Sequence, residues 1–285
     1  MTTLTYQLFN VFATDDIWSG NPLAVFSPAQ ALDDETMQRL AQQMNLSEIT
    51  FVSPCVVADA QVRIFSPSYE LPFAGHPTLG TAFAVANQQK NTCATEEKTT
   101  VTLAMKAGMI PVAVDGEMVT LSANVPTYRA APANVELAKA LNLQPEQIHG
   151  TPRFVNTGSE QLIIPLVDAE SVAQCSLNLD VFARVAANLE GRSGALVWAR
   201  QGDTVIARYF WSQHGQAAED FGTGSACANL GGWLLAENVA LPLTLEMEQG
   251  HAIDRIARLH LSINADRQIQ VGGKVRRVGE GTFDL

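Results

Sequence analysis

The pattern of hydrophobic and polar positions predicts two long, strongly apolar helices, each of which follows a glycine-rich loop. The first loop and helix span residues 70–86, and Pro77 suits the first helical position. One face of that helix is apolar at positions i, i+3, i+4 and i+7, namely Leu79, Ala82, Phe83 and Ala86. The second loop and helix span residues 219–236. Because a helix that is apolar all round must be buried, we expect both helices to lie inside the protein.

The first loop carries a candidate site. Gly75 permits a close approach of the backbone, and His76 lies at the mouth of the predicted helix. The first N–H groups of a helix have no partner within it, and the helix dipole is positive there. The sequence therefore predicts an anion-binding position beside His76.

The two loops belong to a longer internal repeat, which indicates a duplicated half-domain. The matched positions are Gly75 with Gly222, His76 with Thr223, Thr78 with Ser225, Val62–Phe65 with Ala207–Phe210, and 46–52 with 193–199. We expect the two glycine loops to face one another across a cleft, where small-molecule sites are common.

The remaining pattern is rich in short strands, so the predicted fold class is α+β. We expect two pseudo-symmetric halves, each a curved, mostly antiparallel sheet or barrel around its central helix. The first half spans 1–125 and is completed by 271–285, and the second half spans 126–270. Shorter helices are predicted from an Asp33 cap to Asn45, over 133–141, and from an Asp180 cap to about residue 189. A strand over 46–52 places Glu48 on a face with apolar neighbours.

Composition excludes several classes of function. The chain has 285 residues and a net charge of −11, with no Lys or Arg run, so nucleic acid is not an expected partner. No apolar run is long enough to cross a membrane, and the N-terminus lacks a basic start, which favours a cytoplasmic protein. Cys55, Cys93, Cys175 and Cys227 are far apart, and neither they nor the histidines show metal-ligand spacing. We expect no metal and no cofactor.

Three motifs resemble the phenazine-biosynthesis PhzF-like isomerase family. They are Met44-Asn-Leu-Ser-Glu-Ile-Thr-Phe-Val52, Arg63-Ile-Phe-Ser-Pro67 and Glu70-Leu-Pro-Phe-Ala-Gly-His-Pro-Thr-Leu-Gly-Thr-Ala82. Gly20-Asn-Pro22 and Gly272-Gly-Lys-Val275 fit as well, so the resemblance covers nearly the whole chain. It implies the diaminopimelate-epimerase fold, a homodimer, and a cofactor-independent isomerase or epimerase that moves a proton between carbons of a small carboxylate.

Site residues follow from the same resemblance. It implies Glu48 as the general acid and base, with His76 and Asp220 as its helpers. Backbone N–H groups at Gly75 and Gly224 would hold the substrate carboxylate, together with Ser225 and Thr223 of the second loop. One departure concerns the substrate, because Phe221-Gly222 replaces the small or branched pair usual before Thr-Gly-Ser.

Each of these residues also has a structural interpretation. Glu48 could face solvent on a strand, His76 could be a core residue, and Asp220 or Ser225 could cap the second helix. Arg63 and Arg208 occupy matching positions in the repeat, where ion pairs that fix the sheets are favoured over ligand binding. At the level of function, the alternative is a catalytically silent protein that binds small carboxylates on the same fold. A racemase with two thiols is disfavoured, because Ala74 and Phe221 occupy the positions that would need cysteine.

Overall fold

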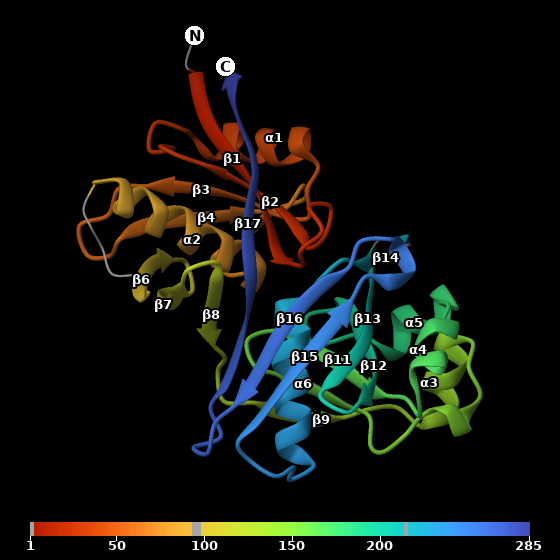
Figure 1. Ribbon diagram of the computed structural model, residues 1–285. Helices are drawn as coiled ribbons and strands as arrows, with labels where there is room; N and C mark the ends of the chain where they lie inside the picture. The colour runs from red at the N-terminus through yellow and green to blue at the C-terminus, as the bar shows by residue number, and fades with distance from the viewer. Residues whose placement is uncertain (1–2, 93–97, 214–215) are drawn as a thin grey trace. The chain divides into compact units, whose positions relative to one another are not determined.

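The computed structural model describes residues 3–92, 98–213 and 216–285, which include neither Cys93 nor His214. The described chain divides into two compact units (Figure 1). Unit 1 comprises 1–121 and 272–285, and unit 2 comprises 122–271. The sequence placed the division after residues 125 and 270.

Unit 1 is a mixed sheet with two helices. Its elements are β1 (Thr3–Ala13), β2 (Asn21–Phe26), α1 (Asp34–Met44), β3 (Ile49–Ser53), β4 (Ala60–Phe65), β5 (Glu70–Leu71), α2 (Gly75–Thr92), β6 (Lys98–Met105), β7 (Gly108–Asp115), β8 (Met118–Ser122) and most of β17 (Ile269–Asp284). Strand β1 pairs antiparallel with both β2 and β17, so the two chain ends lie together (Figure 1). From β2 onward the pairings alternate: β2–β3 parallel, β3–β4 antiparallel, β4–β6 parallel and β6–β7 antiparallel.

Helix α2 is the buried element of unit 1. Residues 76–86 are all buried, and the helix contacts β1, β2, β3, β6 and β7. Gly80 allows the closest contact, because a Cβ atom there would lie 2.4 Å from Leu23 Cδ2 on β2. The expected burial of this helix is therefore confirmed.

Unit 2 repeats this order of pairings. Its elements are β9 (Thr127–Ala130), α3 (Asn134–Leu141), η1 (Pro145–Gln147), β10 (Arg153–Asn156), β11 (Glu160–Pro165), α4 (Ala169–Gln174), α5 (Leu179–Val185), β12 (Ser193–Gln201), β13 (Thr204–Gln213), β14 (Gln216–Asp220), α6 (Gly224–Ala236), β15 (Leu243–Gln249), η2 (His251–Ile253) and β16 (Ala257–Ile263). The pairings are β11–β12 parallel, β12–β13 antiparallel, β13–β15 parallel and β15–β16 antiparallel. The same sequence of directions in both units is what a duplicated half-domain requires.

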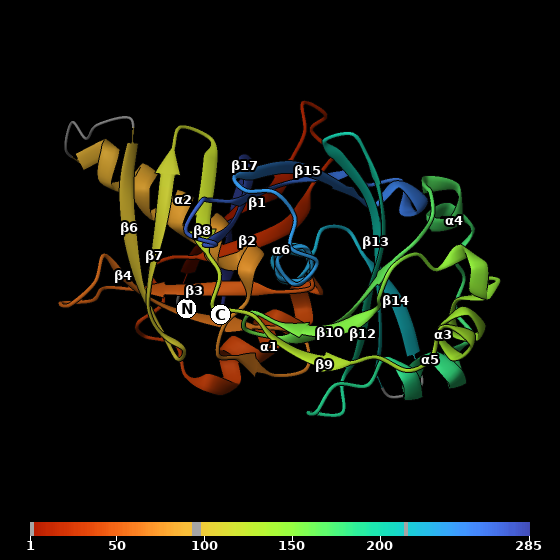
Figure 2. The ribbon, with the colours of Figure 1, turned by 90° about the horizontal axis from the view of Figure 1, so that it is seen from below.

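Helix α6 is the buried helix of unit 2. Residues 226–235 are all buried, and the helix contacts β10, β11 and β16. Figure 2 shows α6 nearly end-on, with strands of its own unit on several sides. The α+β class is thus observed, whereas closure of each sheet around its helix stays a prediction.

Some local predictions are confirmed and others are wrong. Helix α1 begins after Asp33, whose side chain accepts from the Thr36 N–H, and it ends at Asn45 in the left-handed conformation. The Asp180 cap is wrong, because Asn178 accepts from Val181 N–H and starts α5 earlier. The strand over 46–52 is too long at its start: β3 begins at Ile49, so Glu48 lies just before it. No helix of the described residues is long and apolar enough to span a membrane.

Candidate active site

The start of α2 places His76 in the first turn of the helix. The helical hydrogen bonds open with Thr78 N–H, which donates to the Ala74 carbonyl at 3.2 Å, and the Thr78 hydroxyl donates to the same oxygen. Ala74 is therefore the residue that opens the helix, and Gly75 and His76 follow it. Their N–H groups precede the first intrahelical donor, as the sequence predicted.

His76 and Glu48 lie together in unit 1. The distance from His76 Nδ1 to Glu48 Oε2 is 3.4 Å, and the side chains are 7% and 22% exposed. Helix α2 supplies the histidine, and the segment between α1 and β3 supplies the glutamate. The structure thus brings together two of the three residues that the sequence nominated for catalysis.

Burial keeps the His76 imidazole neutral. Loss of solvation lowers the pKa of His76 to about 3, although a hydrogen bond to the backbone of Pro22 opposes this shift. The contact with Glu48 is therefore between a carboxyl group and a neutral ring at pH 7, and it is no ion pair.

The backbone of Pro22 also fixes which ring nitrogen carries the proton. Proline has no N–H, so its carbonyl accepts from the ring. His76 Nε2 is buried and has no hydrogen-bond partner among the described residues, so Nδ1 is the donor. In the neutral ring Nε2 is then an acceptor. Gly20 helps to position this strand, since its φ is +80° and a Cβ atom would lie 2.6 Å from the Val11 carbonyl.

The second glycine loop is held by Gln249, which the sequence did not nominate. The Asp220 carboxylate accepts from the Thr223 hydroxyl at 2.6 Å, so the side chain of Asp220 contacts the loop. Gln249 is fully buried; its Oε1 accepts from Thr223 N–H, and its Nε2 donates to the Asp220 carbonyl and to Thr223 Oγ1. A polar residue in a strand pattern gives no sign of such a contact.

Ser225 lies in the first turn of α6, and its hydroxyl oxygen accepts a hydrogen bond from a buried glutamine. Gln161 Nε2 donates to Ser225 Oγ at 2.8 Å and to the Tyr209 hydroxyl at 3.1 Å. Asn229, on the next turn, donates to Gln161 Oε1 at 2.8 Å. Asn229 is a polar residue inside an apolar helical run, and that pattern could have identified it. Capping by the Ser225 side chain is not what the structure shows, because Thr223 is the N-cap residue.

Phe221 of the same loop contacts the segment between β15 and β16. The Arg255 guanidinium lies 5.4 Å from the centre of the Phe221 ring. Gly250, with φ of +89°, approaches closely enough that a Cβ atom would lie 3.0 Å from the Phe221 carbonyl. The end of β15 therefore supports Thr223 through Gln249, and the segment after it supports Phe221.

The starts of α2 and α6 correspond to one another, but the residues that match differ from those expected from the sequence. The helical bonds of α6 open with Cys227 N–H, which donates to the Thr223 carbonyl, so Thr223 corresponds to Ala74. It follows that Gly224 corresponds to Gly75 and Ser225 to His76, rather than the pairs expected from sequence. The reason is that the segments before the two helices differ in length, so a match between the preceding strands does not carry over to the helices.

Arg63 and Arg208 fix the two sheets, as predicted. Arg63 binds both oxygens of Glu70, and Arg208 binds both oxygens of Glu219. Each guanidinium also lies over a phenylalanine two residues on, at 5.1 Å for Phe65 and 4.7 Å for Phe210. Because both charges are paired inside their own unit, these arginines serve structure.

Two of the cysteines are buried, and their thiols are held in the protonated form. The thiols of Cys175 and Cys227 are buried, and burial raises the pKa of Cys175 to about 12 and that of Cys227 further. In the described ranges there is no group of three or more His, Cys, Asp or Glu able to hold a metal ion. The structural role expected for these two cysteines is consistent with their burial.

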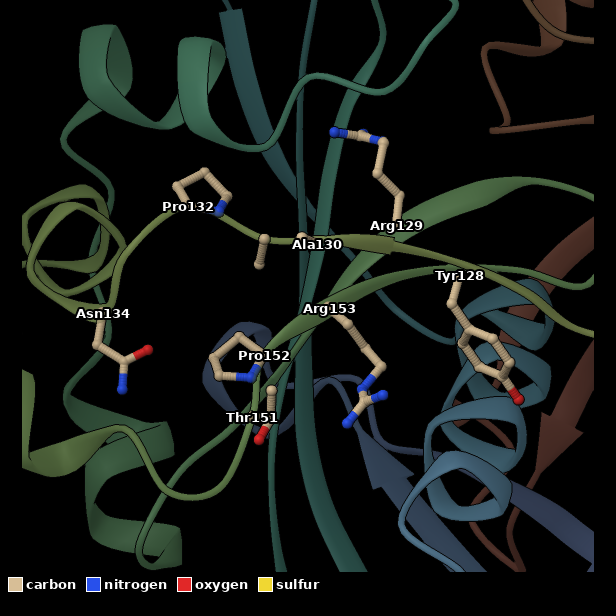
Figure 3. A pocket seen from close by; sticks show the side chains of 9 residues that line it. Tyr128, Arg129, Ala130, Pro132, Asn134, Thr151, Pro152 and Arg153 are labelled. Atoms are coloured by element: carbon tan, nitrogen blue, oxygen red, sulfur yellow. The ribbon is translucent and has the colours of Figure 1, made fainter.

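A surface cavity of about 440 Å³ lies in unit 2, apart from the start of α6. Figure 3 shows Pro132, Asn134, Thr151 and Pro152 around it. Tyr128 beside it donates to the Gly232 carbonyl, roughly 12 Å along α6 from its first residue. Arg129 pairs with Glu160 and Arg153 with Glu237, so the two positive charges are already matched.

Comparison with known proteins gives one family over almost the whole chain. The model of the family described as phenazine biosynthesis-like protein matches residues 9–281. An uncharacterized isomerase of Pasteurella multocida is 36% identical over 99% of this chain and 94% of its own length. The trans-2,3-dihydro-3-hydroxyanthranilate isomerase of Pseudomonas aeruginosa is 34% identical over 90% of this chain and 88% of its own. A solved PhzF-family structure from Bacillus anthracis covers all of both chains with a TM-score of 0.85 and 24% identity.

Proposed function

We propose, since the chain belongs to the phenazine biosynthesis-like family and is an isomerase, that it moves a proton between two carbons of a small unsaturated carboxylate without a cofactor. The substrate class follows the relatives that are named trans-2,3-dihydro-3-hydroxyanthranilate isomerases. The observation that carries the proposal is the contact of Glu48 Oε2 with a buried, neutral His76 at 3.4 Å.

Glu48 is the general acid and base of this proposal. Its carboxylate takes a proton from a carbon whose electron pair passes into the adjacent unsaturated system, and the resulting carboxylic acid returns the proton to another carbon. Nothing is gained or lost overall, so no redox partner is required. A partly exposed carboxyl group next to buried residues can reach substrate and still be shielded from bulk water.

In this proposal His76 orients the substrate, and Glu48 carries the proton. A ring with a pKa near 3 is a poor base at pH 7, but its Nε2 can accept a hydrogen bond from a substrate hydroxyl or amine. Its Nδ1–H donates to the Pro22 carbonyl, which keeps the ring in one tautomer, and Nδ1 lies 3.4 Å from Glu48 Oε2. Support for this role comes from the buried Nε2 atom, which has no hydrogen-bond partner within the described part of the chain.

Unit 2 supplies carboxylate-binding groups in this proposal. The N–H groups of Gly224 and Ser225 precede the first intrahelical donor of α6, and Ser225 Oγ and Thr223 lie at the same helix start. Gly75 supplies the corresponding N–H in unit 1. Asp220, whose carboxylate accepts from the Thr223 hydroxyl, holds the loop and contacts a polar substituent of the substrate in this proposal.

The experiment is an isomerisation assay with trans-2,3-dihydro-3-hydroxyanthranilate at several pH values. Glu48→Gln should lower kcat by about 10³-fold, since general acid–base catalysis contributes on that order. Glu35→Gln is the matched control, because Glu35 is an exposed partner of Arg39 in the same unit. Turnover by Glu48→Gln equal to that of Glu35→Gln would remove Glu48 from the reaction.

The homodimer implied by the family resemblance belongs to this proposal as well. Light scattering coupled to size-exclusion chromatography would give about twice the chain mass of 30.7 kDa for a dimer. A mass of one chain across the accessible concentrations would contradict it.

A further inference from the structure

A buried chain of hydrogen bonds runs behind Ser225 in unit 2. Thr157 donates to Asn229 Oδ1 through both its N–H, at 2.9 Å, and its hydroxyl, at 2.7 Å. Asn229 Nδ2 donates to the Ser159 carbonyl and to Gln161 Oε1, each at 2.8 Å. Gln161 Nε2 then reaches Ser225 Oγ and the Tyr209 hydroxyl. Thr157, Asn229 and Gln161 are all buried.

The direction of this chain is fixed by the backbone. The Thr157 N–H can only donate, so the Asn229 atom that faces it must be the oxygen. The Asn229 NH₂ therefore faces the Ser159 carbonyl, which can only accept, and Gln161 must present its oxygen in turn. The Gln161 NH₂ is thereby turned to Ser225 and Tyr209. Swapping O and N of Asn229 would put donor against donor at Thr157 and acceptor against acceptor at Ser159, and swapping those of Gln161 would put its NH₂ against the NH₂ of Asn229.

We infer that Asn229 and Gln161 are positioning residues that commit the Ser225 hydroxyl to donating, and so select an acceptor, a carboxylate oxygen, as the ligand group at Ser225. Ser225 Oγ already accepts from Gln161, so its own proton points away from the buried chain. This deepens the proposed function and rests on it for the identity of the ligand group. The direction of the buried chain itself does not depend on that function.

Gln161→Glu reverses the direction of the hydrogen bond between residue 161 and Ser225, with almost no change in the shape of the side chain. A carboxylate at position 161 still accepts from Asn229, but it must also accept from Ser225, whose hydroxyl then turns inward. Binding of anthranilate, measured calorimetrically at pH 8, should weaken by about 10- to 100-fold, the loss expected for one hydrogen bond to a charged group. Gln161→Met removes the donor without adding charge and should have a smaller effect.

Measuring the binding of anthranilate to Gln161→Glu at lower pH distinguishes a loss of positioning from damage to the fold. Burial should raise the pKa of the carboxyl group introduced at position 161, and the protonated acid can again donate to Ser225. Anthranilate affinity relative to wild type should therefore recover as the pH falls. Gln268→Glu, which adds the same charge at an exposed position of unit 2, is the control and should bind like wild type at every pH. Wild-type affinity in Gln161→Glu at pH 8, or a loss that is constant with pH, would overturn the inference.

A neutron structure of the unliganded protein tests the direction independently of any ligand. The inference requires the Ser225 hydroxyl deuterium to point away from Gln161 and both amide groups to have the stated orientation. A deuterium directed from Ser225 to Gln161 would overturn it even if carboxylates bind. A deuterium directed away, in a protein that binds no carboxylate and isomerises none, would uphold the direction and remove the proposed function instead.

Discussion

The two helix starts correspond in position but differ in what lies behind them. At the start of α2 the buried neutral His76 contacts Pro22 and Glu48, and at the corresponding place on α6 Ser225 contacts Gln161. One turn further on, Gly80 packs against apolar Leu23, whereas Asn229 hydrogen-bonds to Gln161. The two similar helix starts therefore carry an ionisable pair in unit 1 and a directional set of hydrogen bonds in unit 2.

The largest effect should come from the arginines that brace the two sheets. Arg208 is 13% exposed beside a Glu219 that is 7% exposed, and it also donates to the carbonyls of Ala173 and Cys175. Arg208→Met leaves that carboxylate buried without its partner and should cost about 4 kcal/mol of unfolding free energy. Arg63→Met should cost about 2 kcal/mol, because its pair with Glu70 is more exposed. Urea denaturation measures the unfolding free energy of both variants. Equal losses would mean that the difference in burial between the two ion pairs does not affect their contribution to stability.

The next largest effects on stability should come from substitutions at Asn229 and at the corresponding Gly80. Asn229→Ala leaves the Thr157 N–H, the Ser159 carbonyl and Gln161 Oε1 without a partner and should cost about 3 kcal/mol. Gly80→Ala places a Cβ atom 2.4 Å from Leu23 Cδ2, which must shift, at a cost of about 1 kcal/mol. Thermal unfolding of both variants, each with its far-UV spectrum, would reveal the order. The reverse order would show that the polar chain contributes less than apolar packing.

The sequence predicted those features that depend on neighbouring residues in the chain. The loop and helix of 70–86, the Asp33 cap and the ion-pairing role of Arg63 and Arg208 follow from periodicity, capping chemistry and the repeat. Gln249 and Gln161 were missed, since a buried glutamine on a strand looks the same in sequence as an exposed one. The register of the repeat was wrong because unequal segments before α2 and α6 become visible only from the first helical hydrogen bonds. Glu48 and His76 came from a motif, and their 3.4 Å contact depends on tertiary packing.

His76→Gln tests the unit 1 site by activity. Glutamine keeps a donor for the Pro22 carbonyl but cannot place a ring nitrogen where Nε2 lies, so kcat should fall by about 10²-fold. That loss corresponds to roughly 2.7 kcal/mol of transition-state stabilisation. Steady-state kinetics should show a larger change in kcat than in KM. A change confined to KM would make His76 a binding residue.

The stability of the protein should also depend on pH through His76. The pKa of His76 is about 3 in the folded protein and close to 6.5 when unfolded, so the unfolded chain takes up a proton first as the pH falls. His76 should therefore reduce the unfolding free energy by about 2 kcal/mol between pH 6.5 and pH 5. Urea titrations of wild type and His76→Gln across this window isolate the contribution by difference. Parallel curves would mean that His76 is protonated in the folded protein.

The division of roles between the two units is tested most directly by deuterium incorporation. Wild type, Glu48→Gln and Ser225→Ala are incubated in D₂O with saturating trans-2,3-dihydro-3-hydroxyanthranilate, and the loss of each C–H signal is followed by NMR. We predict that wild type exchanges the transferred proton, that Ser225→Ala still exchanges it once saturated, and that Glu48→Gln does not exchange it. Exchange at the wild-type rate in Glu48→Gln would contradict the account, because proton transfer would then belong to another residue.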